Sequence, residues 1–147
     1  MPTLQVASRS GRAEVVKVLL EAGGNVHTND DGPLRTAAFH GHADVLELLL
    51  AAGADVHAHE DKALQTAVRS NRADVVRLLV NAKANVEEHS GFALLEAAEA
   101  GHVEIVEILV RAGANVNARR GAPLSKALER GHQEVAQILL DAGAVAH

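Results

Sequence analysis

Apolar residues along the chain follow a helical pattern that returns at a fixed interval. The clearest copy spans residues 41–58, GHADVLELLLAAGADVHA, in which leucine and valine fill most of the central stretch. Similar segments, each offset by thirty residues or a multiple of thirty, begin at Gly11, Asn71, Gly101 and Gly131. A period of about 20 to 50 residues is typical of stacked supersecondary units. We therefore expect a chain of similar units, each packed on its neighbours.

Five units follow one another without insertion, over residues 2–31, 32–61, 62–91, 92–121 and 122–147. One repeat position always holds leucine: Leu4, Leu34, Leu64, Leu94 and Leu124. Another always holds alanine: Ala7, Ala37, Ala67, Ala97 and Ala127. This constant register, without a linker, predicts a single domain over residues 1–147.

Each unit predicts two helices joined by a tight turn. In the second unit the first helix covers residues 33–40, with Pro33 near its start, where the missing N–H costs nothing. Gly41 then permits a turn at positive φ. The second helix opens with Asp44, whose carboxylate favours a helix N-terminus, and ends at the left-handed cap Gly53. A polar loop over residues 57–61 leads to the next unit.

The second helix carries more apolar residues than a single buried face needs, so neighbouring units should cover it on two sides. Two positions of the third unit depart from the pattern. Asn71 replaces the turn glycine, which asparagine tolerates. Lys83 replaces the cap glycine, at a cost of about 1 kcal/mol if the backbone stays left-handed. We expect the third unit to be the least stable.

The repeated pattern GH-x-[DE]-V-V-x-L-L-L-x-x-GA-[DN]-V resembles that of ankyrin-repeat proteins over the whole chain. The resemblance implies an all-α fold, an ankyrin-type α-solenoid of five stacked helix-turn-helix repeats. The usual ankyrin unit is three residues longer and starts its first helix with Thr-Pro-Leu-His. Here that start reads Gly-Pro-Leu-Arg at residues 32–35, so the chain is similar to the thirty-residue variety and its inter-repeat loops should be short.

Charge and composition exclude several classes of partner. The chain has 14 Lys and Arg against 19 Asp and Glu, a net charge of −5, so the basic footprint of nucleic-acid binding is absent. Its apolar runs are too short to cross a bilayer, and the N-terminal residues lack the apolar region of a secretion signal. Because there is no cysteine, a disulfide framework and a thiolate zinc site are excluded. We expect an intracellular, cytoplasmic monomer that binds neither nucleic acid nor membrane.

Catalytic and phosphate-binding motifs are missing, so we predict no enzymatic activity and no cofactor. The nine histidines raise the question of a metal site. The turn position holds either histidine or arginine: Arg12, His42, Arg72, His102 and His132. A position that accepts arginine is not a ligand position. The loop residues His57 and His59, with Glu60 or His89, remain an alternative set of ligands, although we predict no metal.

The resemblance implies that a partner binds the concave face, at the ends of the first helices and the adjoining loops. Side chains there differ between units while core positions hardly change. The candidate partner-binding residues are Arg9, Arg35, Phe39, His40, His57, His59, Arg69, Ser70, Glu99, Glu129 and Arg130. Phe39 is either an exposed interface residue or packed down against Leu46 or a neighbouring unit.

We therefore predict a non-catalytic protein–protein interaction or scaffold module that binds a protein or peptide. The candidate surface is basic in its early units, at Arg9, Arg35 and Arg69, and acidic in its later ones. A partner of matching polarity would complement it. The alternative is a structural or engineered stable repeat scaffold, or a fragment of a longer array, without a specific ligand.

Overall fold

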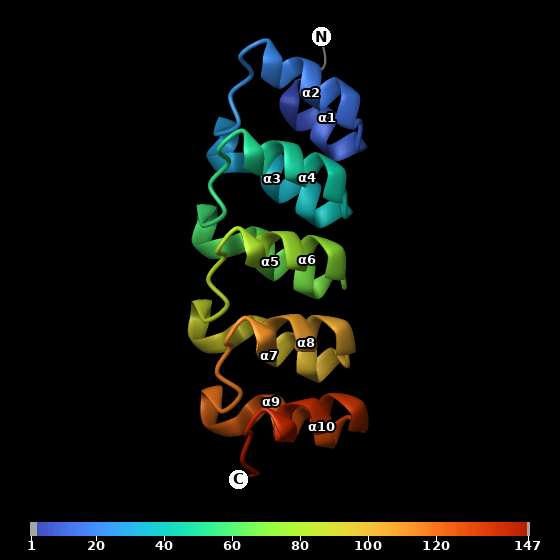
Figure 1. Cartoon of the computed structure of the whole chain (residues 1–147), viewed down its shortest axis with the longest axis vertical. Helices are drawn as coiled ribbons and strands as arrows, with labels where there is room; N and C mark the ends of the chain where they lie inside the picture. The colour runs from blue at the N-terminus through green and yellow to red at the C-terminus, as the bar shows by residue number, and fades with distance from the viewer. Residues whose placement is uncertain (1–2, 147) are drawn as a thin grey trace. The chain divides into compact units, whose positions relative to one another are not determined.

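The computed structural model describes residues 3–146, and within them the ordered elements are helices joined by turns (Figure 1). No strand occurs in this part of the chain, which confirms the all-α prediction. The chain divides into two compact units, Met1–Ala84 and Asn85–His147, which are described separately. These are called the first and the second unit, and the thirty-residue segments are called repeats.

The first unit consists of three helix pairs. Their bounds are α1 (Leu4–Ser10), α2 (Ala13–Glu21), α3 (Thr28–His40), α4 (Ala43–Ala51), α5 (Ala58–Arg69) and α6 (Ala73–Asn81). The first helices form one layer, in which α3 contacts both α1 and α5. The second helices form another, in which α4 contacts α2 and α6. This two-layer stacking of helix pairs is the arrangement that the repeat pattern predicts.

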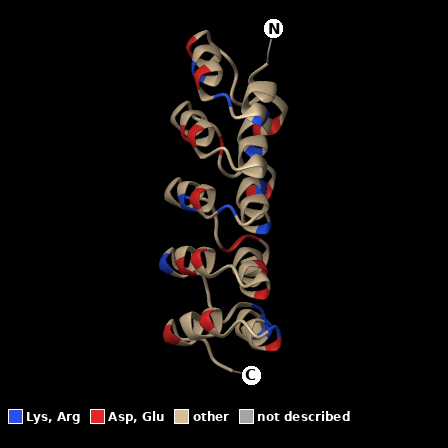
Figure 2. Cartoon of the chain, turned by 90° about the vertical axis from the view of Figure 1, so that its right-hand side faces the viewer, with Lys and Arg blue, Asp and Glu red and all other residues tan. Residues whose placement is uncertain are grey.

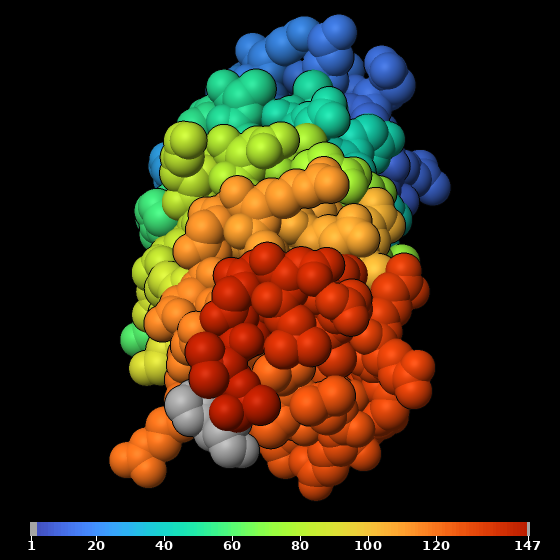
Figure 3. Space-filling view, turned by 60° about the horizontal axis from the view of Figure 1, so that its bottom comes forward, coloured from blue at the N-terminus to red at the C-terminus, as the bar shows by residue number. Residues whose placement is uncertain are grey.

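The second unit repeats this arrangement with two pairs, α7 (Glu88–Ala100) with α8 (Val103–Arg111), and α9 (Ala118–Glu129) with α10 (Gln133–Asp141). Here α7 contacts α9 and α8 contacts α10. The last pair, coloured from orange to red, faces the viewer in Figure 3. It exposes Leu128 and Leu140, and Val145, which follows α10, is exposed as well.

The core is built from the invariant leucine and alanine positions. In the first unit Leu34 and Ala37 are fully buried on α3. On α4 the buried residues are Val45, Leu46 and Leu49, while leucines 48 and 50 are half-buried. The second helix is thus covered on more than one face, as predicted. Each fully buried leucine contributes about 1.5 to 3 kcal/mol through the apolar area it removes from water.

The helix ends confirm the predicted glycine caps. Gly41 has φ 73° and Gly53 has φ 94°, both in the left-handed region. The N–H of His42 donates to the Ala37 carbonyl at 2.9 Å, which closes α3 in the manner of a Schellman cap. Asn71 and Lys83 keep the same left-handed backbone, with φ 55° and 73°. The predicted conformational cost at Lys83 is therefore present.

The loops between repeats differ from the plain polar loops expected. Three successive residues in each take left-handed backbone angles, over residues 29–31, 59–61, 89–91 and 119–121. We call these segments the inter-repeat turns. A left-handed residue other than glycine costs about 1 to 2 kcal/mol, so each turn needs compensating contacts. Side chains supply them, since Gln65 Nε2 donates to the Glu60 carbonyl at 2.9 Å and Arg119 donates to the carbonyls of His89 and Ser90.

Candidate functional site

A pocket of about 300 Å³ lies on the surface of the first unit formed by α1, α3 and α5. We call it the α3 pocket. It is lined by Arg9, Arg35, Thr36, Phe39, His40, Lys62 and Thr66. Arg9, Arg35, Phe39 and His40 are candidates from the sequence, and the structure brings these four together.

The other three lining residues, Thr36, Lys62 and Thr66, were missed by sequence reasoning. Thr36 lies three residues before Phe39 on α3, a spacing that places both on one helix face. Thr66 occupies the same repeat position one repeat later. That spacing was the signal that could have identified the two threonines, but it does not identify Lys62.

Phe39 is the exposed aromatic side chain of this pocket. Its exposed fraction is 55%, whereas Leu46 on α4 is fully buried. The structure thus supports the exposed alternative for Phe39. The His40 ring meets it edge to face, with centroids 4.9 Å apart and an angle of 83° between the planes. The neighbouring imidazole therefore supports one side of an otherwise accessible ring.

Arg35 is held in place by the inter-repeat turn that precedes α3. Its Nη2 donates to the Asn29 carbonyl at 2.8 Å, and its Nε donates to the Asp30 carbonyl at 3.3 Å. These bonds use two of the five N–H donors of a guanidinium. The other N–H donors of Arg35 remain available in the pocket, and the two bonds fix the orientation of the guanidinium.

The pocket is basic. Three of its lining residues, Arg9, Arg35 and Lys62, are cationic, and its lining contains no carboxylate. Figure 2, with Lys and Arg in blue, shows basic segments on successive helix pairs of this unit. The Thr36 hydroxyl lines the pocket and hydrogen bonds to the side-chain amide of Gln5.

Histidines at the turn position have a structural role. His42 Nε2 lies 3.0 Å from the Arg9 carbonyl oxygen, which links the turn after α3 to the end of α1. In the second unit His132 Nε2 lies 3.1 Å from the Glu99 carbonyl oxygen. A Cβ added at Gly11 would come within 2.6 Å of the His42 ring, so glycine is the residue that fits beside it without a shift of the ring.

The loop candidates His57 and His59 lie outside the lining of the α3 pocket. His57 Nδ1–H donates to the Asp61 carboxylate at 3.1 Å, and Asp61 is buried. His59 Nε2 lies 3.3 Å from Asp30 Oδ2 at the surface. The two imidazoles thus contact different carboxylates.

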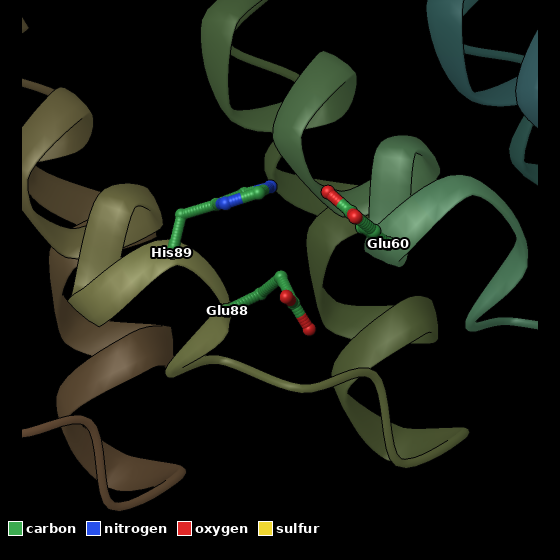
Figure 4. A group of neighbouring side chains, drawn as sticks. All are labelled: Glu60, Glu88 and His89. Atoms are coloured by element: carbon green, nitrogen blue, oxygen red, sulfur yellow. The ribbon is translucent and has the colours of Figure 1, made fainter.

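Figure 4 draws three further side chains in or next to the inter-repeat turns. Glu88 and His89 are consecutive residues at the start of α7, while Glu60 comes from the turn at the start of α5. Glu60 belongs to the first unit and the other two to the second. Each is therefore assigned to its own unit, and no site is built from the three.

The remaining candidates do not line the α3 pocket. Arg69 is exposed at the end of α5, and Ser70 is the half-buried residue that follows it. In the second unit Arg130 Nη2 pairs with Glu99 Oε1 at 2.7 Å, and Lys126 Nζ lies 3.3 Å from Glu129 Oε2. The charges of these second-unit residues are thus balanced by one another.

His102 is half-buried at the start of α8. Desolvation lowers the pKa of its imidazole below the ordinary 6.5, and the nearby His132 lowers it further, while Glu96 acts in the opposite direction. The unfolded chain therefore takes up a proton at this residue before the folded chain does. The protonation of His102 therefore does not affect the free energy of unfolding above the unfolded pKa of 6.5. As pH falls from there toward the folded pKa, it lowers the free energy of unfolding.

We expect the His102→Gln variant to lose less stability on acidification than the wild type. Urea unfolding at about pH 7.5 and about pH 5.5 measures the difference, because glutamine cannot take up the proton that favours the unfolded state. His40→Gln is the matched control, since it removes an exposed imidazole that forms no ion pair with any of the described residues. An equal loss in the wild type and in His102→Gln would contradict the prediction.

The fold defines an α-helical repeat protein, built from antiparallel helix pairs with a turn glycine or asparagine between the two helices. A family model for ankyrin repeats, which describes three copies, matches residues 3–90 and again residues 67–146. The chain belongs to the ankyrin-repeat family. A comparison with curated proteins finds no match. None of the helices in the described residues has the length and apolar character needed to cross a membrane.

Proposed function

We propose that the chain is a non-catalytic interaction module that binds a protein or peptide through the ends and exposed faces of its first helices. Ankyrin repeats are generally protein–protein interaction modules. The proposal places the centre of the binding surface at the α3 pocket, with Arg9, Arg35, Phe39 and His40 as contact residues. Arg69 and Ser70 would extend the surface along the first unit, and Glu99, Glu129 and Arg130 would be contacts of the second.

The exposure of Phe39 carries the proposal. More than half of its surface is exposed, although it lies on a helix whose other large apolar residues are buried. Full burial of a phenylalanine side chain contributes about 1.5 to 3 kcal/mol, and a partner that covered the exposed half of Phe39 would contribute roughly half of that. Because α3 and its neighbours hold the lining residues in place, little ordering is required on binding.

Residues 1–147 are proposed to act as one ankyrin-repeat domain, because the repeat register runs through the chain without interruption. We also propose an intracellular monomer whose partner is neither nucleic acid nor membrane. The net charge of −5 supports the exclusion of nucleic acid and membrane, since both of those surfaces are anionic.

Affinity capture with the wild type, Phe39→Ala and Val18→Ala tests the binding surface. Val18 is the control because it is also an exposed apolar residue, with an exposed fraction of 62%, but belongs to a second helix. We expect Phe39→Ala to capture at least tenfold less partner than the wild type, and Val18→Ala to capture as much as the wild type. Circular dichroism checks that each variant is folded.

Equal recovery of every partner by the three proteins would contradict the proposed surface. It would favour the alternative of a repeat scaffold without a specific ligand. If only Val18→Ala captured less partner, the binding surface would instead lie on the second helices.

A further inference from the structure

We infer that the α3 pocket selects an acidic peptide segment, in which aspartate or glutamate carboxylates engage Arg9, Arg35 and Lys62. The inference rests on the proposed function of the first unit as a peptide-binding surface. It adds the chemistry of the partner, which that function leaves open.

The positive charge of Arg9 and Lys62 in the pocket is not balanced by ion pairs with the residues that the structure describes. No carboxylate lines it, and neither Arg9 nor Lys62 has an ion-pair partner among residues 3–146. The chain as a whole carries a net charge of −5. A positive pocket on a negative protein attracts an acidic segment locally, while the remaining surface repels it.

The positions of the cations favour an extended chain over a compact anion. Arg9, Arg35 and Lys62 belong to α1, α3 and α5, three successive helices of one layer. Neighbouring packed helices are spaced about 8 to 10 Å apart. In an extended peptide, residues two and three apart are separated by about 7 and 10 Å. Acidic residues at such spacings can each reach a different cation.

The remaining lining residues suit the rest of such a peptide. Phe39 provides an apolar contact for an aliphatic or aromatic side chain within the acidic segment. The hydroxyl groups of Thr36 and Thr66, which line the pocket, are polar groups of the kind that contact a carboxylate or a peptide main chain. The fixed guanidinium of Arg35 offers paired donors of the geometry that carboxylates accept.

The second unit lacks this combination. At the repeat position of Arg9 and Phe39 it has Glu99 and Glu129. Glu99 is paired with Arg130, and Glu129 with Lys126. Selection of acidic peptides is thus a property of the first unit.

Fluorescence anisotropy on the full chain tests the inference with a labelled peptide of about twelve residues. The probe has acidic residues at alternate positions around a central leucine. Matched probes replace the acids by glutamine or by lysine. We expect the acidic probe to bind at least tenfold more tightly than the glutamine probe, with affinity that falls as salt is raised. The lysine probe should not bind at the α3 pocket.

Charge reversal locates the binding. The double variant Arg9→Glu with Lys62→Glu is expected to bind the acidic probe at least tenfold more weakly than the wild type. Its control, Lys17→Glu with Lys83→Glu, makes the same change in net charge at exposed residues outside the pocket. Urea unfolding of both variants checks that they fold.

Equal affinity for the acidic and glutamine probes, or equal loss in the two double variants, would overturn the inference. Tighter binding of a single-stranded RNA of about twelve nucleotides than of the acidic probe would do so too. If Phe39→Ala loses captured proteins while the acidic probe fails to bind, the peptide chemistry is wrong and the proposed surface stands. If both experiments fail, the surface itself is wrong.

Discussion

Replacement of Asp31 by alanine is expected to lower the free energy of unfolding by about 2 kcal/mol. The Asp31 carboxylate is buried at the end of an inter-repeat turn. It accepts hydrogen bonds from His27 Nδ1–H at 3.0 Å and from the N–H of Asp55, in the following repeat, at 2.8 Å. Alanine would leave that N–H without its acceptor and would cut one link between two repeats.

The second unit makes the same link with a different residue. Gly91 occupies the repeat position of Asp31, and Glu87 occupies that of His27. Here the Glu87 carboxylate accepts the bond from the N–H of Asn115. A Cβ at Gly91 would lie 3.6 Å from Glu87 Oε2, so the glutamate lies where an aspartate at residue 91 would have to fit. The carboxylate that accepts the bond thus lies four residues earlier in the repeat than Asp31 does, while the N–H that donates keeps the same repeat position.

This exchange provides a rescue experiment. The double variant His27→Glu with Asp31→Gly copies the second-unit arrangement and should regain most of the stability that Asp31→Ala loses. Asp30→Ala is the control, because Asp30 is an exposed neighbour whose contact with His59 contributes less than about 1 kcal/mol. Urea unfolding measures all four proteins. If Asp31→Ala costs no more than Asp30→Ala, the link has no energetic importance.

Replacement of Lys83 by glycine is expected to raise the free energy of unfolding by about 1 kcal/mol. Lys83 has φ 73°, is exposed, and donates its N–H to the Val80 carbonyl at 3.0 Å. Glycine keeps this bond and removes the clash of Cβ with the left-handed backbone. Its greater freedom in the unfolded chain offsets part of the gain.

The reverse change at Gly53 is the matched control. Gly53 caps α4 as Lys83 caps α6, and a Cβ added there would have no heavy atom within 4 Å. Gly53→Lys should therefore lose about 1 kcal/mol for conformational reasons alone. Thermal and urea unfolding compare both variants with the wild type. Changes of the same sign in the two variants would contradict the explanation.

The helix pairs and their caps were predictable from the sequence because they depend on local periodicity and on glycine. Comparison of equivalent positions was enough to identify the left-handed backbone at Lys83. The inter-repeat turns were not predictable in this way. The third position of each turn is Asp or Gly, but the first two positions vary from Asn and Asp to His, Glu, Ser and Arg, with no consistent turn former. Their conformation is set by contacts with side chains elsewhere, such as that of Arg35.

The α3 pocket was half predictable for a related reason. Arg9 and Phe39 could be identified because they vary at a position where folding does not require a particular residue. Lys62 lies where other repeats place Gly32 and Phe92, a position that looked like a helix start rather than a surface. His57 was included as a loop residue, but its imidazole bonds to Asp61. A sequence pattern does not tell which of two nearby polar groups a histidine will contact.

The carboxylates of Asp31 and Glu87 each bond to a main-chain N–H of the next repeat, not to a side chain. Every residue except proline offers that donor. A repeat that is duplicated, lost or moved to another place in the chain therefore carries a connector that fits whatever repeat follows it. Lineages of such proteins can change the number and order of their repeats without matching new side chains at each junction.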